Sequence, residues 1–103
     1  MQLLSQKERN EFTFEDSKFF YRRINVNEME ILRKKHTVRG ELNAIPFGID
    51  VADAGMLDWD GIVDETGKPV KYSKELITQL PANVISTLAN LITGGTGEVE
   101  KNW

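Results

Sequence analysis

The spacing of apolar residues changes along this chain, and this change constrains the fold more than any other feature. Phe12 and Phe14, then Phe19 and Tyr21, alternate with polar residues on either side of the polar segment 15–18. Such alternation of β-favouring aromatics predicts a β-hairpin. A helical stripe near the other end predicts a final helix that stops at Gly94-Gly95; it comprises Val84, Ile85, Leu88, Leu91 and Ile92.

The segments between these two also carry helix signals. Asn25 and Glu28 have the spacing of a capping box, which predicts a helix from about residue 26 to about residue 37, with Gly40 beyond it as a stop. A further helix is predicted from about residue 46 to about residue 55. Its apolar residues keep helical spacing: Ile45, Ile49, Ala52 and Met56. Asp50 and Asp53 are expected on its exposed side.

Two shorter elements follow. Ile62-Val63 and the segment 70–72 flank a turn rich in acid and glycine, which predicts a small second strand pair. Ser73 is a candidate cap for a helix that carries Leu76, Ile77 and Leu80, and Pro81 is expected to end it.

With 103 residues, the chain has the length of one domain. We therefore expect a small single α+β domain over residues 11–93, with an N-terminal β-hairpin, three to four helices and a short second strand pair. Residues 1–10 and 94–103 are expected to be flexible ends. No signal sequence or membrane-length apolar run is apparent, so the expected location is the cytoplasm.

Composition excludes several kinds of chemistry. The chain has no cysteine and one histidine, His36, which removes thiol catalysis and the usual zinc sites. The acidic segment that starts at Asp58 lacks the ligand spacing of a calcium loop, because Ile62 and Val63 stand at two required positions. The glycines at 94–97 lack the lysine of a phosphate loop. We expect no catalytic, cofactor-binding or metal-binding residues, and a binding protein rather than an enzyme.

Charge is sorted along the chain although the net charge is only −3. Residues 17–39 carry seven basic side chains and two acidic ones, whereas residues 40–67 carry seven acidic side chains and no lysine or arginine. Two interpretations follow. The two charge types form neighbouring faces of one monomer, or a basic face of one copy meets an acidic face of the next in head-to-tail self-association.

The candidate partner-binding residues come from both regions. The basic ones are Arg22, Arg23, Arg33, Lys34 and Lys35. They suit a face for a protein partner or, as the alternative, a phosphate-contacting patch of a small nucleic-acid-binding regulator. The acidic region adds Trp59 between Asp58 and Asp60. Trp59 is either a core aromatic or the anchor of an interaction surface.

The order of these features resembles the tail assembly chaperone family of tailed phages and prophages, and related small tail-module proteins. Three segments carry the resemblance: the aromatic hairpin with its capped helix (residues 12–28), the stretch from Leu57 through Asp58-Trp59-Asp60-Gly61 to Val70, and Tyr72 to Glu75 with Leu80-Pro81 and the closing helix. The resemblance implies a non-enzymatic protein of the bacterial host cytoplasm that binds tape-measure or tail-tube proteins and tends to self-associate as a homo-oligomer. The net negative charge and the lack of a membrane-length apolar run predict that neither nucleic acid nor a membrane is the partner.

Overall fold

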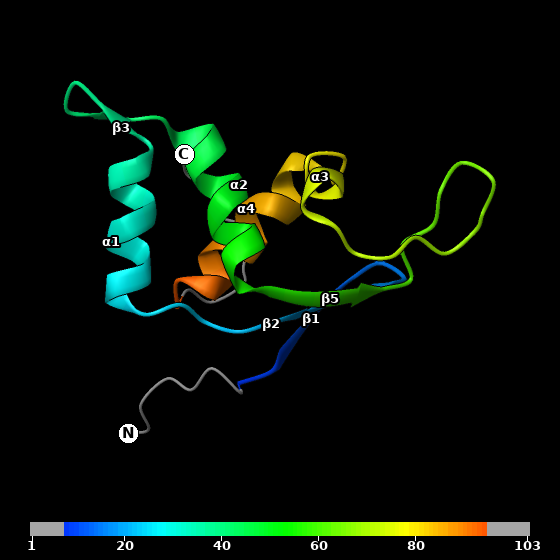
Figure 1. Cartoon of the computed structure of the whole chain (residues 1–103). Helices are drawn as coiled ribbons and strands as arrows, with labels where there is room; N and C mark the ends of the chain where they lie inside the picture. The colour runs from blue at the N-terminus through cyan, green and yellow to red at the C-terminus, as the bar shows by residue number, and fades with distance from the viewer. Residues whose placement is uncertain (1–7, 95–103) are drawn as a thin grey trace.

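The computed structural model describes residues 8–94, which form one α+β domain. A three-stranded antiparallel sheet lies on one side, and helices cover one of its faces (Figure 1). The elements in chain order are β1 (Asn10–Phe14), β2 (Ser17–Tyr21), α1 (Val26–Lys35), β3 (Thr37–Val38), β4 (Glu41–Leu42), α2 (Ala44–Gly55), β5 (Met56–Asp60), α3 (Lys74–Ile77) and α4 (Ala82–Ile92). The predicted fold class is confirmed.

The predicted hairpin is β1 and β2, and its turn is shorter than the polar segment suggested. Phe14 pairs with Ser17, so only Glu15 and Asp16 form the turn. Glu15 has a φ of 53°, and a positive φ at the first turn residue is typical of two-residue hairpin turns. The sheet gains a third strand, β5, which the sequence patterns do not predict. It pairs antiparallel with β2 and places Trp59 opposite Phe19.

The capping box of α1 is formed as predicted. The Asn25 side chain accepts a hydrogen bond from the Glu28 backbone N–H, and the Glu28 carboxylate accepts one from the Asn25 N–H. The Arg22 guanidinium donates two hydrogen bonds to the same carboxylate. These contacts join the end of β2 to the start of α1.

Replacing Asn25 with alanine is expected to lower the free energy of unfolding by about 1 kcal/mol, because one N–H at the helix start loses its acceptor. Asn27→Ala, at an exposed position of the same helix, is the matched control and should stay within about 0.5 kcal/mol. Urea unfolding followed by circular dichroism measures both. Equal effects of the two variants would contradict the capping role.

The chain after α1 differs from the prediction. The helix ends at Lys35 with His36 as its cap, and the next residues form a hairpin of β3 and β4. Arg39 and Gly40 both adopt positive φ angles and make its turn. Gly40 therefore turns a hairpin instead of only ending a helix.

Helix α2 confirms the predicted helix and starts two residues earlier, with Pro46 in its first turn. The expected placement of its aspartates is wrong for Asp50, which is buried with 8% of its surface exposed. Asp53 is half-buried. Ile45, which shares the helical spacing of Ile49 and Ala52, is 78% exposed. The final helix is confirmed as α4, and the predicted helix after Ser73 is the single turn α3.

The core lies between the sheet and the helix pair α2 and α4. Its fully buried members include Phe19, Ile77 and Leu88. Helices α2 and α4 meet at Gly55, where a Cβ atom would lie 2.6 Å from Ile92 side-chain atoms and 2.7 Å from the Arg22 carbonyl oxygen. Only glycine allows this approach of three segments.

The predicted second strand pair is reduced to one bridge between Val63 and Pro69, which closes the long loop after β5. Within the described residues, no helix is long and apolar enough to cross a membrane. Glu8 and Arg9 belong to the end that is expected to be flexible; Glu8 pairs with Arg23 just after β2, and Arg9 stacks on Phe20 of β2. The predicted flexibility of residues 1–7 and 95–103, including Trp103, lies outside the described residues.

Candidate functional site

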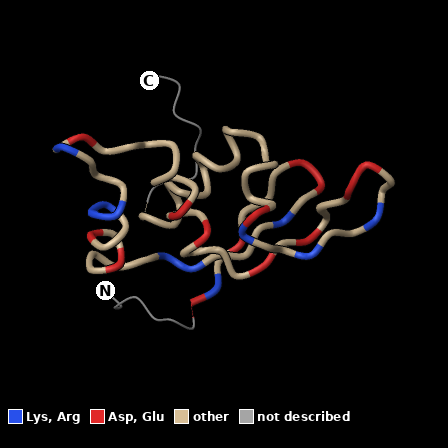
Figure 2. The backbone as a smooth tube through the Cα atoms, turned by 45° about the horizontal axis from the view of Figure 1, so that its top comes forward, with Lys and Arg blue, Asp and Glu red and all other residues tan. Residues whose placement is uncertain are grey.

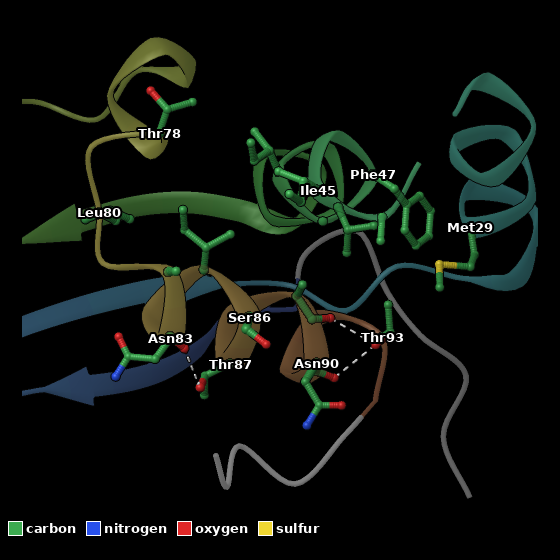
Figure 3. A pocket seen from close by; sticks show the side chains of 17 residues that line it. Met29, Ile45, Phe47, Thr78, Leu80, Asn83, Ser86, Thr87, Asn90 and Thr93 are labelled. Atoms are coloured by element: carbon green, nitrogen blue, oxygen red, sulfur yellow. Dashed lines mark hydrogen bonds between the residues drawn. The ribbon is translucent and has the colours of Figure 1, made fainter. Parts of the chain in front are cut away.

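A groove of about 810 Å³ runs between α2 and α4. Figure 3 shows Met29 of α1 at one end and Thr78 with Leu80 at the other. The other lining residues are Ala44, Ile45, Phe47, Gly48, Ile49 and Val51 on the α2 side and Ala82, Asn83, Ile85, Ser86, Thr87, Ala89, Asn90 and Thr93 on the α4 side.

The groove carries no charge. None of its 17 lining residues is acidic or basic, whereas a chain with 28% charged residues would place about five among 17. Two charge-free segments produce this surface: residues 42–49, at the start of α2, and residues 77–97, which include all of α4. A surface that excludes charge in a charge-rich protein suits a partner whose contact face is also uncharged.

The two walls differ in chemistry. The α2 wall is apolar and includes Ile45, most of whose surface is exposed. The α4 wall carries a polar stripe: Asn83, Ser86, Asn90 and Thr93. Their three- and four-residue spacing places them along one face of the helix. Within the described residues, the side chains of Asn83, Ser86 and Asn90 make no hydrogen bond, so their polar groups are available to a bound partner.

An ionic cluster forms around the buried carboxylate of Asp50 in α2. The two oxygens of Asp50 bind three groups: Oδ2 lies 2.6 Å from His36 Nε2 and 3.0 Å from Lys35 Nζ, and Oδ1 lies 3.0 Å from Lys74 Nζ. Burial alone would raise the pKa of Asp50, but hydrogen bonds from His36, Lys35 and Lys74 outweigh it and hold that pKa well below its usual range. The cluster therefore ties α1, α2 and α3 together.

The cluster also reaches the groove and the sheet. The His36 ring packs edge-on against Phe47, with ring centroids 6.3 Å apart, and Phe47 lines the groove. On the other side, Tyr72 donates a hydrogen bond to Asp53, and burial together with this bond raises the pKa of Tyr72. The Tyr72 ring in turn contacts Trp59 edge-on. Packing thus connects the groove wall with the core.

The cluster has the arrangement of a structural ion-pair network. Among residues 8–94, His36 contacts a single carboxylate, that of Asp50, and both oxygens of this carboxylate already have partners. His36 and Asp50 lie outside the groove lining. In the described residues, no three histidine, aspartate or glutamate side chains gather as metal ligands do.

Four of the five predicted basic residues take part in ion pairs. Arg22 pairs with Glu28, Arg23 with Glu8, Lys35 with Asp50 and Arg33, at 4.0 Å, with Glu30. Of the five, only Lys34 has no ion pair among the described residues. In Figure 2, basic and acidic segments both occur at the α1 end of the tube and in the long loop after β5. Of these four pairs, only Lys35–Asp50 joins the basic stretch 17–39 to the acidic stretch 40–67.

The predicted acidic residues lie apart from this basic group. Asp58 and Asp60 are exposed on β5, where each carboxylate accepts the N–H of the residue that follows. Trp59 between them is a core residue, 6% exposed, and its indole N–H donates to the Val70 carbonyl. Within the described residues, no ion pair joins Asp58 or Asp60 to the basic residues of α1.

Sequence reasoning missed the groove, although one signal was available. The segment from Ile77 to Gly97 contains no charged residue in a chain where charges are frequent. Read together with the helical spacing of α4, this segment indicates a helix whose outer face is polar but uncharged. The contribution of α2 to the groove could not be predicted from the sequence, because Ile45 has the spacing of a core residue although the structure exposes it.

No protein-family model matches this chain, and no curated protein or solved structure matches it either.

Proposed function

We propose that this chain is a non-enzymatic, chaperone-like tail assembly protein of a phage or prophage, which binds a tail structural protein in the cytoplasm of the bacterial host. The observation that carries the proposal is the charge-free groove between α2 and α4. The resemblance of three segments to tail assembly chaperones supports it and suggests a tape-measure or tail-tube protein as the partner.

The shape of the groove favours a helical occupant. Its polar stripe runs from Asn83 to Thr93, which corresponds to about 15 Å along the helix axis. A partner helix of about three turns matches this length. Its apolar face would contact the α2 wall, and its polar uncharged side chains would bond to the amides of Asn83 and Asn90. This is the helix-in-groove mode of recognition.

The ion pairing in the structure favours this function over the nucleic-acid alternative. Phosphate binding depends on cations that are free to replace counterions. Arg22 and Arg23 are instead engaged by Glu28 and Glu8, and Lys35 is engaged by Asp50. A protein partner that binds in the uncharged groove does not need these cations to be free.

A pair of matched variants tests the proposal. Ile45 and Ile31 are both exposed isoleucines on helices, at 78% and 68%, but only Ile45 lines the groove. We expect Ile45→Glu to weaken binding of the purified tape-measure or tail-tube protein from the same phage by at least about tenfold, because a carboxylate would lose its water in the groove. Ile31→Glu should change the affinity less than about twofold. Isothermal titration calorimetry measures both.

The fold should survive both substitutions. A glutamate at position 45 lies in the first turn of α2, where a negative charge is favourable. Circular dichroism checks this point. If neither tail protein binds the wild-type chain, or if Ile31→Glu weakens binding as much as Ile45→Glu, the groove is not the binding surface and the proposal fails.

A further inference from the structure

Within residues 8–94, the outer edge of the sheet is open at β1. The strand order is β1-β2-β5, so β1 pairs on one side only among the described residues. The two described residues before β1 leave this edge uncovered, because Glu8 binds Arg23 beyond β2 and Arg9 stacks on Phe20 of β2. An unpaired strand edge is a template for another strand.

The register identifies which backbone groups face outward. Phe14 and Ser17 flank the two-residue turn, and such a pair exchanges both of its hydrogen bonds. Bonding then alternates along the ladder, so Phe14, Phe12 and Asn10 bond to β2. The backbone N–H and C=O groups of Glu11 and Thr13 therefore point away from the sheet.

The opposite edge is protected, and β1 is not. Strand β5 has an irregular register beside Leu57 and carries two exposed aspartates, both of which are features that discourage edge pairing. Strand β1 is regular over five residues and contains no proline, lysine or bulge. Its two phenylalanines, Phe12 and Phe14, are only half-buried on the core side of the sheet. A strand added at this edge would cover the rest of their rings.

Strand β1 is complementary to a second copy of itself. In an antiparallel pair centred on Phe12, all five residues pair and Glu11 faces Thr13 of the other copy at both ends. The same register brings Phe12 next to Phe12 of the second copy at a position where side chains lie close. A pair centred on Glu11 would instead place two carboxylates opposite each other, and it would pair only three residues.

We infer that this chain forms a twofold-symmetric dimer through antiparallel pairing of β1 with β1, which joins two three-stranded sheets into one of six strands. The contact is isologous and closes after two copies. It differs from the head-to-tail association that the sorted charges suggested. It leaves the groove between α2 and α4 free, and it does not depend on the proposed function.

Two substitutions of Thr13 test the register. Within one copy Thr13 lies opposite Lys18, so Thr13→Glu places a favourable charge pair in the monomer. In the dimer the same substitution sets carboxylates opposite both Glu11 residues, and we expect the dimer dissociation constant to rise about tenfold. Thr13→Lys has the reverse effect, because its ammonium faces Glu11 of the other copy. We expect its dissociation constant to stay equal or fall.

Light scattering after size exclusion, from about 10 µM to 1 mM, should show the wild-type mass rising from 11.7 kDa toward twice that value. Amide exchange at Glu11 and Thr13 should slow over the same range. The double variant E11K/T13E restores opposite charges and should recover the dimer lost in T13E. A wild type that stays monomeric at 1 mM, larger open assemblies, or equal behaviour of T13E and T13K would each overturn the inference.

Discussion

Replacement of Trp59 by alanine is expected to lower the free energy of unfolding by about 3–5 kcal/mol, which is the range for truncating a large buried aromatic. The indole is 6% exposed and contacts the rings of Phe19 and Tyr72 edge-on. Alanine would leave a cavity between the sheet and α3 and would orphan the Val70 carbonyl. Urea unfolding followed by circular dichroism measures the loss.

Trp59→Phe separates packing from hydrogen bonding. Phenylalanine keeps an aromatic ring against Phe19 but cannot donate to Val70, so we expect a loss of about 1–2 kcal/mol beyond the reduction in size. If Trp59→Ala left stability within about 1 kcal/mol and instead abolished binding of a tail protein, Trp59 would be an interaction anchor and its assignment to the core would be wrong.

Asp50→Ala is expected to lower the free energy of unfolding by about 2–3 kcal/mol. The substitution removes the common acceptor of three basic side chains, one of which, His36, is itself largely buried. The ammonium groups of Lys35 and Lys74 reach solvent, which moderates the loss. Asp53→Ala on the same helix removes one hydrogen bond from Tyr72 and a longer contact to Lys74, so it should cost about 1 kcal/mol.

The effect of Asp50 should depend on pH with a definite sign. Its folded-state pKa lies below the ordinary value of 3.8, so the unfolded chain takes up the proton at higher pH than the folded chain. Stability from this carboxylate is complete above about pH 5 and falls as the pH drops through 3.8 and below. Asp50→Asn should flatten the acid limb of the stability profile. An unchanged slope between pH 4 and 2 would rule out this role.

Local patterns were sufficient for most of the helices and for the first hairpin. The capping box at Asn25, the alternation at Phe12 to Phe14 and the stripe of α4 each depend on residues close in sequence, and each is confirmed. Strand β5 was missed because its register is irregular beside Leu57, which breaks the alternation, and because its partner β2 lies far away in the chain.

The misplacement of Asp50 has a similar cause. On a helical projection Asp50 belongs to the polar side of α2, and only the packing of α1 and α3 against that side buries it. Its partners come from positions 35, 36 and 74, which no local pattern connects. The groove was hidden for the opposite reason, since Ile45 has core spacing but no neighbour that covers it.

The close approach at Gly55 fixes the distance between α2 and α4 independently of the side chains that line the groove. The spacing of α2 and α4 is set at their C-terminal ends by backbone and by Ile92, where no side chain larger than hydrogen fits on α2. The lining residues Ile45, Ser86 and Asn90 take no part in that contact. Under the proposed function, substitutions at these lining residues would alter which partner fits and would leave the Gly55 contact unchanged.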